Sequence, residues 1–278
     1  MKRLLILVFL FCLTPAVYGA FEIIWVSDAH DAVNPGTPDD QGWVDVLTSA
    51  GYTVDYQKNV PGTGPWRGDL TAAQIQALND ADLVILSRDA GTAAHNKPDV
   101  WNSITSPMIS LNNYMARSSI WQWVNSTSIN ARQTYYDLKA DDPGHPVFEG
   151  VELDANGQVV WYDATAGSGF AGFKNTADVG NGHLIASRPD NGNLLIVEWE
   201  AGVPFYATTS QVPAGKRMLF CAGNQEVSGT NKFFGAYNLS PAGEQMFLNA
   251  VAYMIPEPTT IVLLALGSLV LTRYRRQS

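Results

Sequence analysis

The chain has 278 residues, of which 46% are hydrophobic and 15% are charged, and its mean hydropathy is −0.04. This composition excludes a disordered chain, a collagen-like repeat and a polytopic membrane protein. The formal charge is −9, with 17 Lys and Arg against 26 Asp and Glu, so we expect no nucleic-acid partner, which would require clustered basic residues.

Residues 1–19 have the pattern of a secretory signal peptide. Lys2 and Arg3 form a basic start, residues 4–13 are apolar, and Val17-Tyr18-Gly19 places small residues at the −3 and −1 positions. We therefore expect cleavage after Gly19 and export of the remaining chain.

Residues 20–255 predict a single α/β domain. In the first half, apolar runs at 21–26, 52–56, 83–86 and 107–111 predict strands. Helical patterns lie between these runs, at 39–50, from residue 70 onward and at 100–105. Alternating strands and helices indicate right-handed crossovers and a parallel sheet.

The second half of the domain changes character. Runs at 159–163, 183–187, 194–199 and 205–209 read as strands without helices between them. Turn sequences at 154–157 and 190–192 support hairpins. A buried strand at 216–221 and a helix from Ser240 through Tyr253 close the domain. We expect an antiparallel β insertion before this last strand and helix.

Three segments carry a family resemblance: 81–88, 217–223 and 239–243. With this order of elements, the chain resembles the class I glutamine-amidotransferase-like superfamily, and within it the ThuA-like branch. The resemblance implies an α/β, flavodoxin-like parallel sheet sandwich with a functional edge where the strands end. Amidotransferases need a cysteine nucleophile on a strand-to-helix elbow. Residues 111–114 stand there without a cysteine, and Cys221 lies in an apolar strand, so glutamine amidotransfer is not expected.

Ligands of open parallel sheets bind beyond the carboxyl ends of the strands. The loops predicted there carry carboxylate, imidazole, guanidinium and amide groups, which suit a sugar or carboxylate ligand. The candidate ligand-binding residues are Asp28, His30, Asp31, Arg88, Asp89, His95, Asn112, Asn113, Arg117, Asn224 and Glu226. Of these, Asp28, His30 and Asp89 are the candidate catalytic acid–base residues. The alternative is that such short polar residues only cap helices and tighten turns.

Other ligand signals are weak. His30, His95, His145 and His183 show no paired metal-ligand spacing, so no metal and no cofactor are predicted. Residues 167–172 match G-x-G-x-x-G outside the strand-to-helix setting that a dinucleotide needs. Most tryptophans are expected in the core, but the i, i+2 spacing of Trp121 and Trp123 suggests that one is exposed for stacking on a sugar.

The C-terminus has three parts: Pro256-Glu257-Pro258, an apolar run at 261–271, and a cluster of Arg273, Arg275 and Arg276. The run is shorter than the roughly 20 residues of a membrane-spanning helix. This order resembles the PEP-CTERM sorting signal. The resemblance implies recognition by an exosortase and the secretion machinery, and transient residence in the inner membrane. Delivery would then be to the cell envelope, the outer surface or the extracellular matrix of a Gram-negative bacterium.

Three functions remain open at this point. The first is a non-catalytic envelope protein that binds a glycan or a matrix partner. The second is a ThuA-like hydrolase or isomerase of sugars that uses the strand-end Asp and His residues. The third is a structural spacer in a surface layer.

Overall fold

The computed structural model describes residues 21–56, 66–133, 137–163, 171–225, 230 and 232–255. The predicted signal peptide, residues 167–170 of the G-x-G-x-x-G match, and Glu226 lie outside this part. The same holds for the predicted sorting residues Pro256, Glu257, Pro258, Arg273, Arg275 and Arg276. In the part that is described, no helix has the length and hydropathy of a membrane span.

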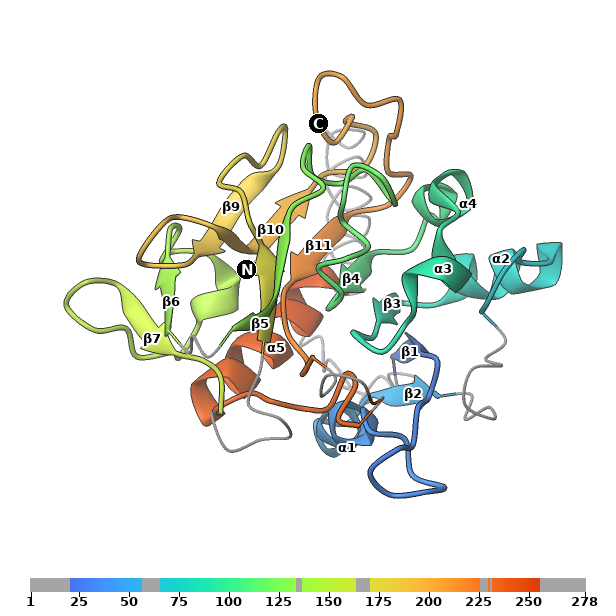
Figure 1. Cartoon of the computed structure of the whole chain (residues 1–278), viewed down its shortest axis with the longest axis horizontal. Helices are drawn as coiled ribbons and strands as arrows, with labels where there is room; N and C mark the ends of the chain where they lie inside the picture. Colours follow the sequence, from blue (N-terminus) through green and yellow to red (C-terminus); the bar gives the residue numbers. More distant parts are fainter. Residues whose placement is uncertain are drawn as a thin grey trace, which may run out of the picture.

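A nine-stranded mixed sheet organises the domain, in the order β2-β1-β3-β4-β11-β10-β9-β6-β7 (Figure 1). The first five of these strands pair in parallel: Thr53–Asp55 (β2), Glu22–Val26 (β1), Leu83–Leu86 (β3), Met108–Ser110 (β4) and Arg217–Phe220 (β11). The other four strands are antiparallel: Leu194–Trp199 (β10), His183–Ser187 (β9), Asp137–Ala140 (β6) and Gln158–Val160 (β7). Two further strands, Ile129–Gln133 (β5) and Ala171–Lys174 (β8), form a separate ladder. This mixed sheet is consistent with the predicted flavodoxin-like α/β fold and its antiparallel extension.

Helices cover both faces of the parallel strands. Helices Gln41–Ser49 (α1) and Pro241–Met254 (α5) share one face, where the Trp43 and Phe247 rings lie 4.9 Å apart. The chain passes from β1 outward to β2 and back over β1 to β3. Right-handed crossovers then place Ala72–Asp80 (α2) on the face opposite α1. Short helices Thr92–His95 (α3) and Pro98–Ser103 (α4) and the 3-10 turn Pro146–Phe148 (η1) complete the described elements.

The helix boundaries follow from local chemistry. The Thr71 hydroxyl accepts the Gln74 backbone N–H, and the Gln74 side chain accepts the Thr71 N–H, which is a capping box at the start of α2. Ser240 accepts the Gly243 N–H at the start of α5, and Pro241 occupies the first helical position. These signals lie close to where the sequence predicts the two helices to begin.

The tryptophans correct one prediction. Trp121 and Trp123 are both fully buried, so neither is exposed for stacking on a sugar. Their indole N–H groups donate to the His95 carbonyl and to Asn102 Oδ1. The i, i+2 spacing misled because this segment is neither helix nor strand, and its turns direct both rings inward.

The predicted strand at 205–209 is also wrong. Phe205 and Tyr206 are buried, but the backbone there is a turn, held by the Thr209 N–H donating to the Tyr206 carbonyl. Two large aromatic side chains produced the strand signal, although they fill the core from an irregular loop.

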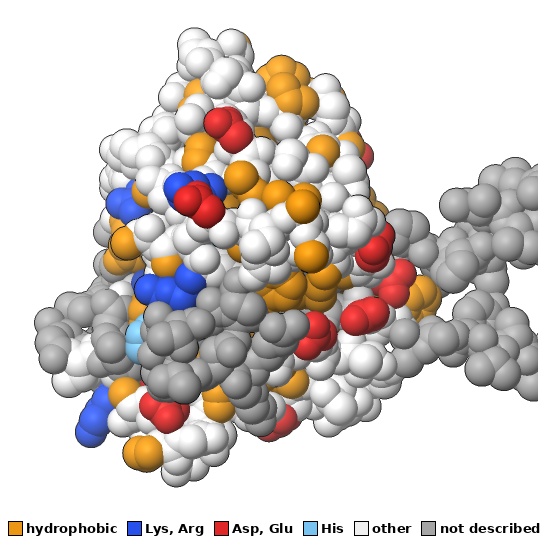
Figure 2. Space-filling model, turned by 90° about the vertical axis from the view of Figure 1, so that its right-hand side faces the viewer, with side chains coloured by type: hydrophobic (Ala, Val, Ile, Leu, Met, Phe, Trp, Pro, Cys, Tyr) orange, Lys and Arg blue, Asp and Glu red, His pale blue; other side chains and the backbone are white. Residues whose placement is uncertain are grey.

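On the face shown in Figure 2, acidic and basic side chains are scattered among neutral ones.

Candidate functional site

A buried carboxylate organises the carboxyl ends of β1 and β3. Asp40, directly before α1, is fully buried, and its Oδ2 accepts hydrogen bonds from Trp25 Nε1 at 3.0 Å, Ser27 Oγ at 2.7 Å and Ser87 Oγ at 2.5 Å. Its Oδ1 accepts the Tyr56 hydroxyl at 2.5 Å. Four donors satisfy the carboxylate, so it fixes both strand ends relative to α1.

Next to this network, His30 and Asp89 form a close pair. Asp89 Oδ1 lies 2.5 Å from His30 Nδ1, and Asp89 Oδ2 accepts the His30 backbone N–H at 2.8 Å. The Ser27 hydroxyl lies 3.1 Å from the same Oδ2. Asp89 is fully buried, whereas the His30 side chain is 18% exposed. Because Nδ1 faces the carboxylate, the Nε2 atom of His30 lies on the other side of the ring.

The pKa values of both side chains in this pair are raised. The hydrogen bond to Asp89 raises the pKa of His30 above its ordinary value. Burial raises the pKa of Asp89 to about 7, against the opposing effect of His30. The carboxyl group of Asp89 therefore titrates near neutral pH, where a general acid–base group is most effective.

A pH dependence of stability follows from this pair. Since the pKa of His30 is raised on folding, its stabilisation is complete below the unfolded value of roughly 6.5 and is lost as pH rises through the folded value. We expect the free energy of unfolding to fall between about pH 6.5 and the raised folded pKa, by at most ~1.4 kcal/mol per pH unit for this one group. Urea unfolding at a series of pH values measures it. Asp89→Asn should flatten this part of the curve, and equal slopes in both proteins would contradict the assignment.

Unusual backbone geometry flanks the pair. Ala29, between Asp28 and His30, has φ 54°, and Phe233 has φ 61°. Such values are uncommon for residues other than glycine and concentrate at functional sites. Gly235 has φ 73°, and a Cβ there would approach the Asp89 backbone nitrogen to 2.8 Å. The segments around residues 29 and 233–235, which flank the pair of His30 and Asp89, therefore have uncommon backbone conformations.

A cavity of about 290 Å³ opens beside the pair, at the ends of β3, β4 and β11. Its wall contains Arg88, whose guanidinium carbon lies 4.5 Å from the centre of the Tyr114 ring and 4.9 Å from that of Phe234. Arg88 also donates a hydrogen bond to Gln225 Oε1. The Phe234 ring packs at 5.4 Å on the His30 ring, so one aromatic side chain connects the cavity to the pair. The remaining lining residues are Ala90, Gly91, Thr92, Ala93 and Asn112.

Two predicted residues lie behind the cavity wall. Asp28 is buried, and its Oδ2 accepts the Gly91 N–H at 3.0 Å. The same oxygen forms an ion pair with Arg67 Nη1 at 2.5 Å. His95 is fully buried, and its Nδ1 contacts the Gly91 carbonyl at 2.9 Å. Burial lowers the pKa of His95, so it stays neutral. Both side chains support Gly91, which lines the cavity, and neither lines it itself.

The other predicted residues divide into three groups. Asn112 lines the cavity, but its side-chain NH2 group donates hydrogen bonds to the carbonyls of Arg88 and Ala90. Arg117 contacts Tyr114, with its guanidinium carbon 5.1 Å from the ring centre, and Asp31 accepts the Gly36 N–H at an exposed turn. Asn113 and Asn224 are buried, and neither is among the cavity-lining residues.

Cys221 follows β11 and is fully buried. Burial raises the pKa of its thiol to about 12, so the thiolate that nucleophilic chemistry requires is not formed near neutral pH. Its sulfur lies 3.8 Å from the Leu194 carbonyl, and the side chain serves as a small core residue.

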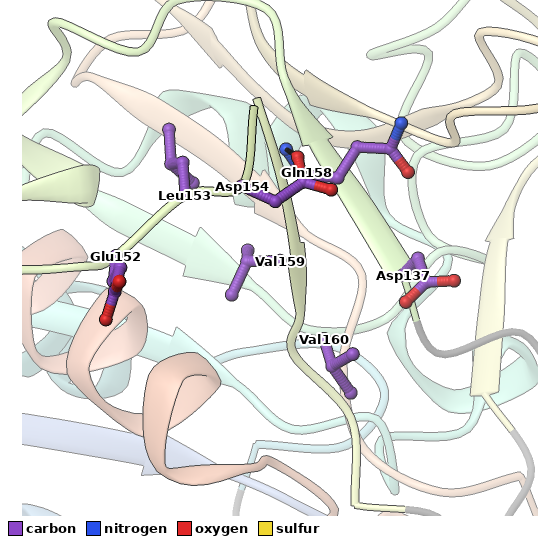
Figure 3. A pocket seen from close by; sticks show the side chains of 7 residues that line it. All are labelled: Asp137, Glu152, Leu153, Asp154, Gln158, Val159 and Val160. Atoms are coloured by element: carbon purple, nitrogen blue, oxygen red, sulfur yellow. Dashed lines mark hydrogen bonds between the residues drawn. The ribbon is translucent and has the colours of Figure 1, made fainter. Parts of the chain in front are cut away.

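A larger hollow of about 470 Å³ lies at the edge of the antiparallel strands (Figure 3). Asp154 uses its carboxylate to accept the N–H groups of Asn156 and Gln158, both at 2.8 Å. Glu152 and Asp137 lie on opposite sides of the hollow and do not point toward each other (Figure 3). The side chains drawn there do not converge, so the smaller strand-end cavity is the better candidate site.

Several residues of the site have no clear signal in the sequence. Asp40 reads as an ordinary residue in the first turn of the helix predicted at 39–50, and Tyr114, Gln225 and Phe234 read as loop residues. Only their positions after predicted strand ends could have drawn attention to Tyr114 and Gln225. The structure also brings His145, His183 and Glu198 together from three separate segments, with ligand atoms within 4.8 Å of one another.

Comparison with protein-family models gives no match, and no curated protein matches the chain in sequence. Among solved structures, the chain is similar to cytoplasmic protein STM3548 from Salmonella typhimurium, with a TM-score of 0.50 and 12% identity over 84% of this chain and 99% of that one. A Bacteroides uniformis protein described as ThuA-like has a TM-score of 0.44 and 10% identity over 86% of this chain and 94% of that one. The first similarity shows a shared fold across most of the chain.

Proposed function

We propose that this is a ThuA-like domain that binds a sugar in the strand-end cavity and processes it by hydrolysis or isomerisation. In this proposal, His30 acts as the general base and Asp89 holds its ring in place. The observation that carries it is the 2.5 Å contact between His30 Nδ1 and Asp89 Oδ1 beside the cavity. The resemblance of segments 81–88 and 217–223 to ThuA-like proteins supports the same assignment.

The division of roles follows from the contacts. With the Nδ1 proton directed at Asp89, His30 can accept a substrate proton at Nε2, and the buried carboxylate stabilises the imidazolium that forms. Arg88, Thr92 and Gln225 provide polar groups on the cavity wall, and Tyr114 and Phe234 provide aromatic faces. A few convergent polar groups on an aromatic wall suit a sugar.

A second candidate is glycan binding without catalysis. His30 is not among the residues that line the cavity, whereas Arg88, stacked between two rings, is. The cavity wall is ordered by the stacking of Arg88, and Phe234 lies between the wall and His30. This arrangement favours binding of a glycan without catalysis. The two candidates share the binding site and differ only in turnover.

A thermal-shift screen with sugars tests binding at this cavity. A ligand at 100 times its dissociation constant adds about 2.7 kcal/mol, or roughly 5–10 °C for a domain of this size. Ala93→Trp should abolish the shift, because Ala93 is an exposed helical residue on the cavity wall. Ala77→Trp is the matched control, since Ala77 is exposed on α2 and is not a lining residue. Equal shifts in both variants would place the sugar elsewhere.

We further propose that the chain is exported and sorted by an exosortase to the cell envelope or the extracellular matrix, with transient passage through the inner membrane. The basic and apolar start, and the Pro-Glu-Pro, apolar and arginine order of the last 23 residues, support this proposal. Intact mass spectrometry of the protein from the envelope should show both segments removed. A mature protein that keeps the arginine cluster would contradict the sorting proposal.

A further inference from the structure

A second cluster of titratable side chains lies at the other end of β11 from the cavity. His145 directly precedes η1, His183 begins β9 and Glu198 lies on β10. His183 and Glu198 are partners in the antiparallel ladder, which brings their side chains together. Neither the proposed base nor the cavity uses any of these groups.

Two separations within this cluster are close to those that a zinc ion requires, and all three ligand atoms lie within 4.8 Å of one another. Glu198 Oε1 lies 3.2 Å from His183 Nδ1 and 3.6 Å from His145 Nε2. Tetrahedral zinc with bonds of about 2.0–2.1 Å holds its ligands roughly 3.3–3.4 Å apart. We propose that His145 Nε2, His183 Nδ1 and Glu198 Oε1 bind one Zn²⁺ ion. The His183 side chain is 49% exposed, so the fourth position faces solvent and takes a water molecule.

Neighbouring groups orient two of the three ligands. Asp142 Oδ2 lies 3.1 Å from His183 Nε2, which directs the proton to that nitrogen and leaves Nδ1 for the metal. Lys216 lies 3.0 Å from the other oxygen of Glu198 and 3.0 Å from Glu200. Three carboxylates against one lysine leave a local negative charge that a divalent cation neutralises.

His145 supplies the ligand that is hardest to explain otherwise. Its side chain is only 4% exposed, and its Nε2 makes no hydrogen bond within the described residues. Its Nδ1 accepts the Val147 N–H at 3.2 Å. Zinc at Nε2 moves the ring proton to Nδ1, so metal binding must release this contact at the start of η1. A buried imidazole nitrogen aimed at a carboxylate 3.6 Å away gains a partner in exchange.

Equilibrium dialysis of the purified protein against Zn²⁺ alone tests the proposal. The expected result is one ion per chain. His183→Gln should weaken binding at least 100-fold, and because this side chain is half-exposed the variant should fold. Asp142→Asn should weaken binding by about 10–100-fold, as outer-shell changes do. His30→Gln is the matched control, since it removes a histidine outside the cluster and should leave binding unchanged.

Substitution with Co²⁺ gives an independent readout. A tetrahedral site of nitrogen and oxygen ligands should give visible d–d absorption that His183→Gln removes. Zinc affinity that is the same in the wild type, His183→Gln and Asp142→Asn would overturn the proposal. Loss of binding in His30→Gln instead would move the metal to the strand-end site. Neither result depends on whether the chain processes a sugar.

Discussion

Replacing Asp89 with asparagine is expected to lower kcat for the sugar that binds best by about 10²–10⁴-fold, with little change in KM. A positioned acid–base group contributes a factor of this size. Asparagine has a single side-chain oxygen, so it cannot accept both the Nδ1 proton and the backbone N–H of His30, and it lacks the charge that stabilises the imidazolium. His30→Gln should give a loss of similar size. Steady-state kinetics on the sugars found by the thermal-shift screen measure both effects.

Asp31→Asn is the control for these variants. Asp31 lies one residue after His30, but its carboxylate accepts the Gly36 N–H at an exposed turn. Its replacement should leave kcat within about a factor of two of the wild type, because surface changes rarely alter more than ~0.5 kcal/mol. Wild-type turnover in Asp89→Asn, or a loss in Asp31→Asn equal to that in His30→Gln, would contradict the proposed roles.

The second large effect concerns stability. Asp40→Ala leaves the donors of Trp25, Ser87 and Tyr56 without their acceptor beside the ends of β1 and β3, whereas the Ser27 hydroxyl can still donate to Asp89 Oδ2. Each unsatisfied buried polar group costs about 1–3 kcal/mol, and we expect a total loss of about 4 kcal/mol in the free energy of unfolding. Urea unfolding monitored by circular dichroism measures it.

Asp45→Ala provides the comparison on the same helix. Asp45 is exposed, and its carboxylate accepts a hydrogen bond from the Gln41 side chain at 2.8 Å. Its replacement should change the free energy of unfolding by less than ~0.5 kcal/mol. A loss in Asp40→Ala that is no larger than in Asp45→Ala would show that the buried network does not hold the strand ends together.

The parallel half of the fold is predictable from the sequence for a physical reason. Strands β1 and β3 are buried on both faces, so they appear as continuous apolar runs between polar turns. The predicted strands 183–187 and 194–199 coincide with β9 and β10. The small strands β5, β6 and β8 were missed, because their sequences mix polar and apolar residues without a clear period.

The site was less predictable than the sheet. Position at a strand end predicts that His30 and Asp89 approach each other, and they do. The same rule cannot tell a side chain that faces the cavity, such as Arg88, from one buried behind it, such as His95. That distinction depends on turns such as the left-handed backbone at Ala29, and an alanine in the sequence does not predict such a turn. The cluster of His145, His183 and Glu198 depends on strand register, which spacing in the sequence does not show.

The most direct test of the strand-end site is imidazole NMR of the wild-type protein with the sugar that gives the largest thermal shift. The sequence contains only four histidines, so each ring signal can be assigned by single substitution. The account predicts that the sugar shifts the signals of His30, which packs on the cavity residue Phe234, and leaves those of His145 and His183 unchanged. Shifts confined to His145 and His183, with His30 unaffected, would contradict the central claim that the ligand binds at the ends of the parallel strands.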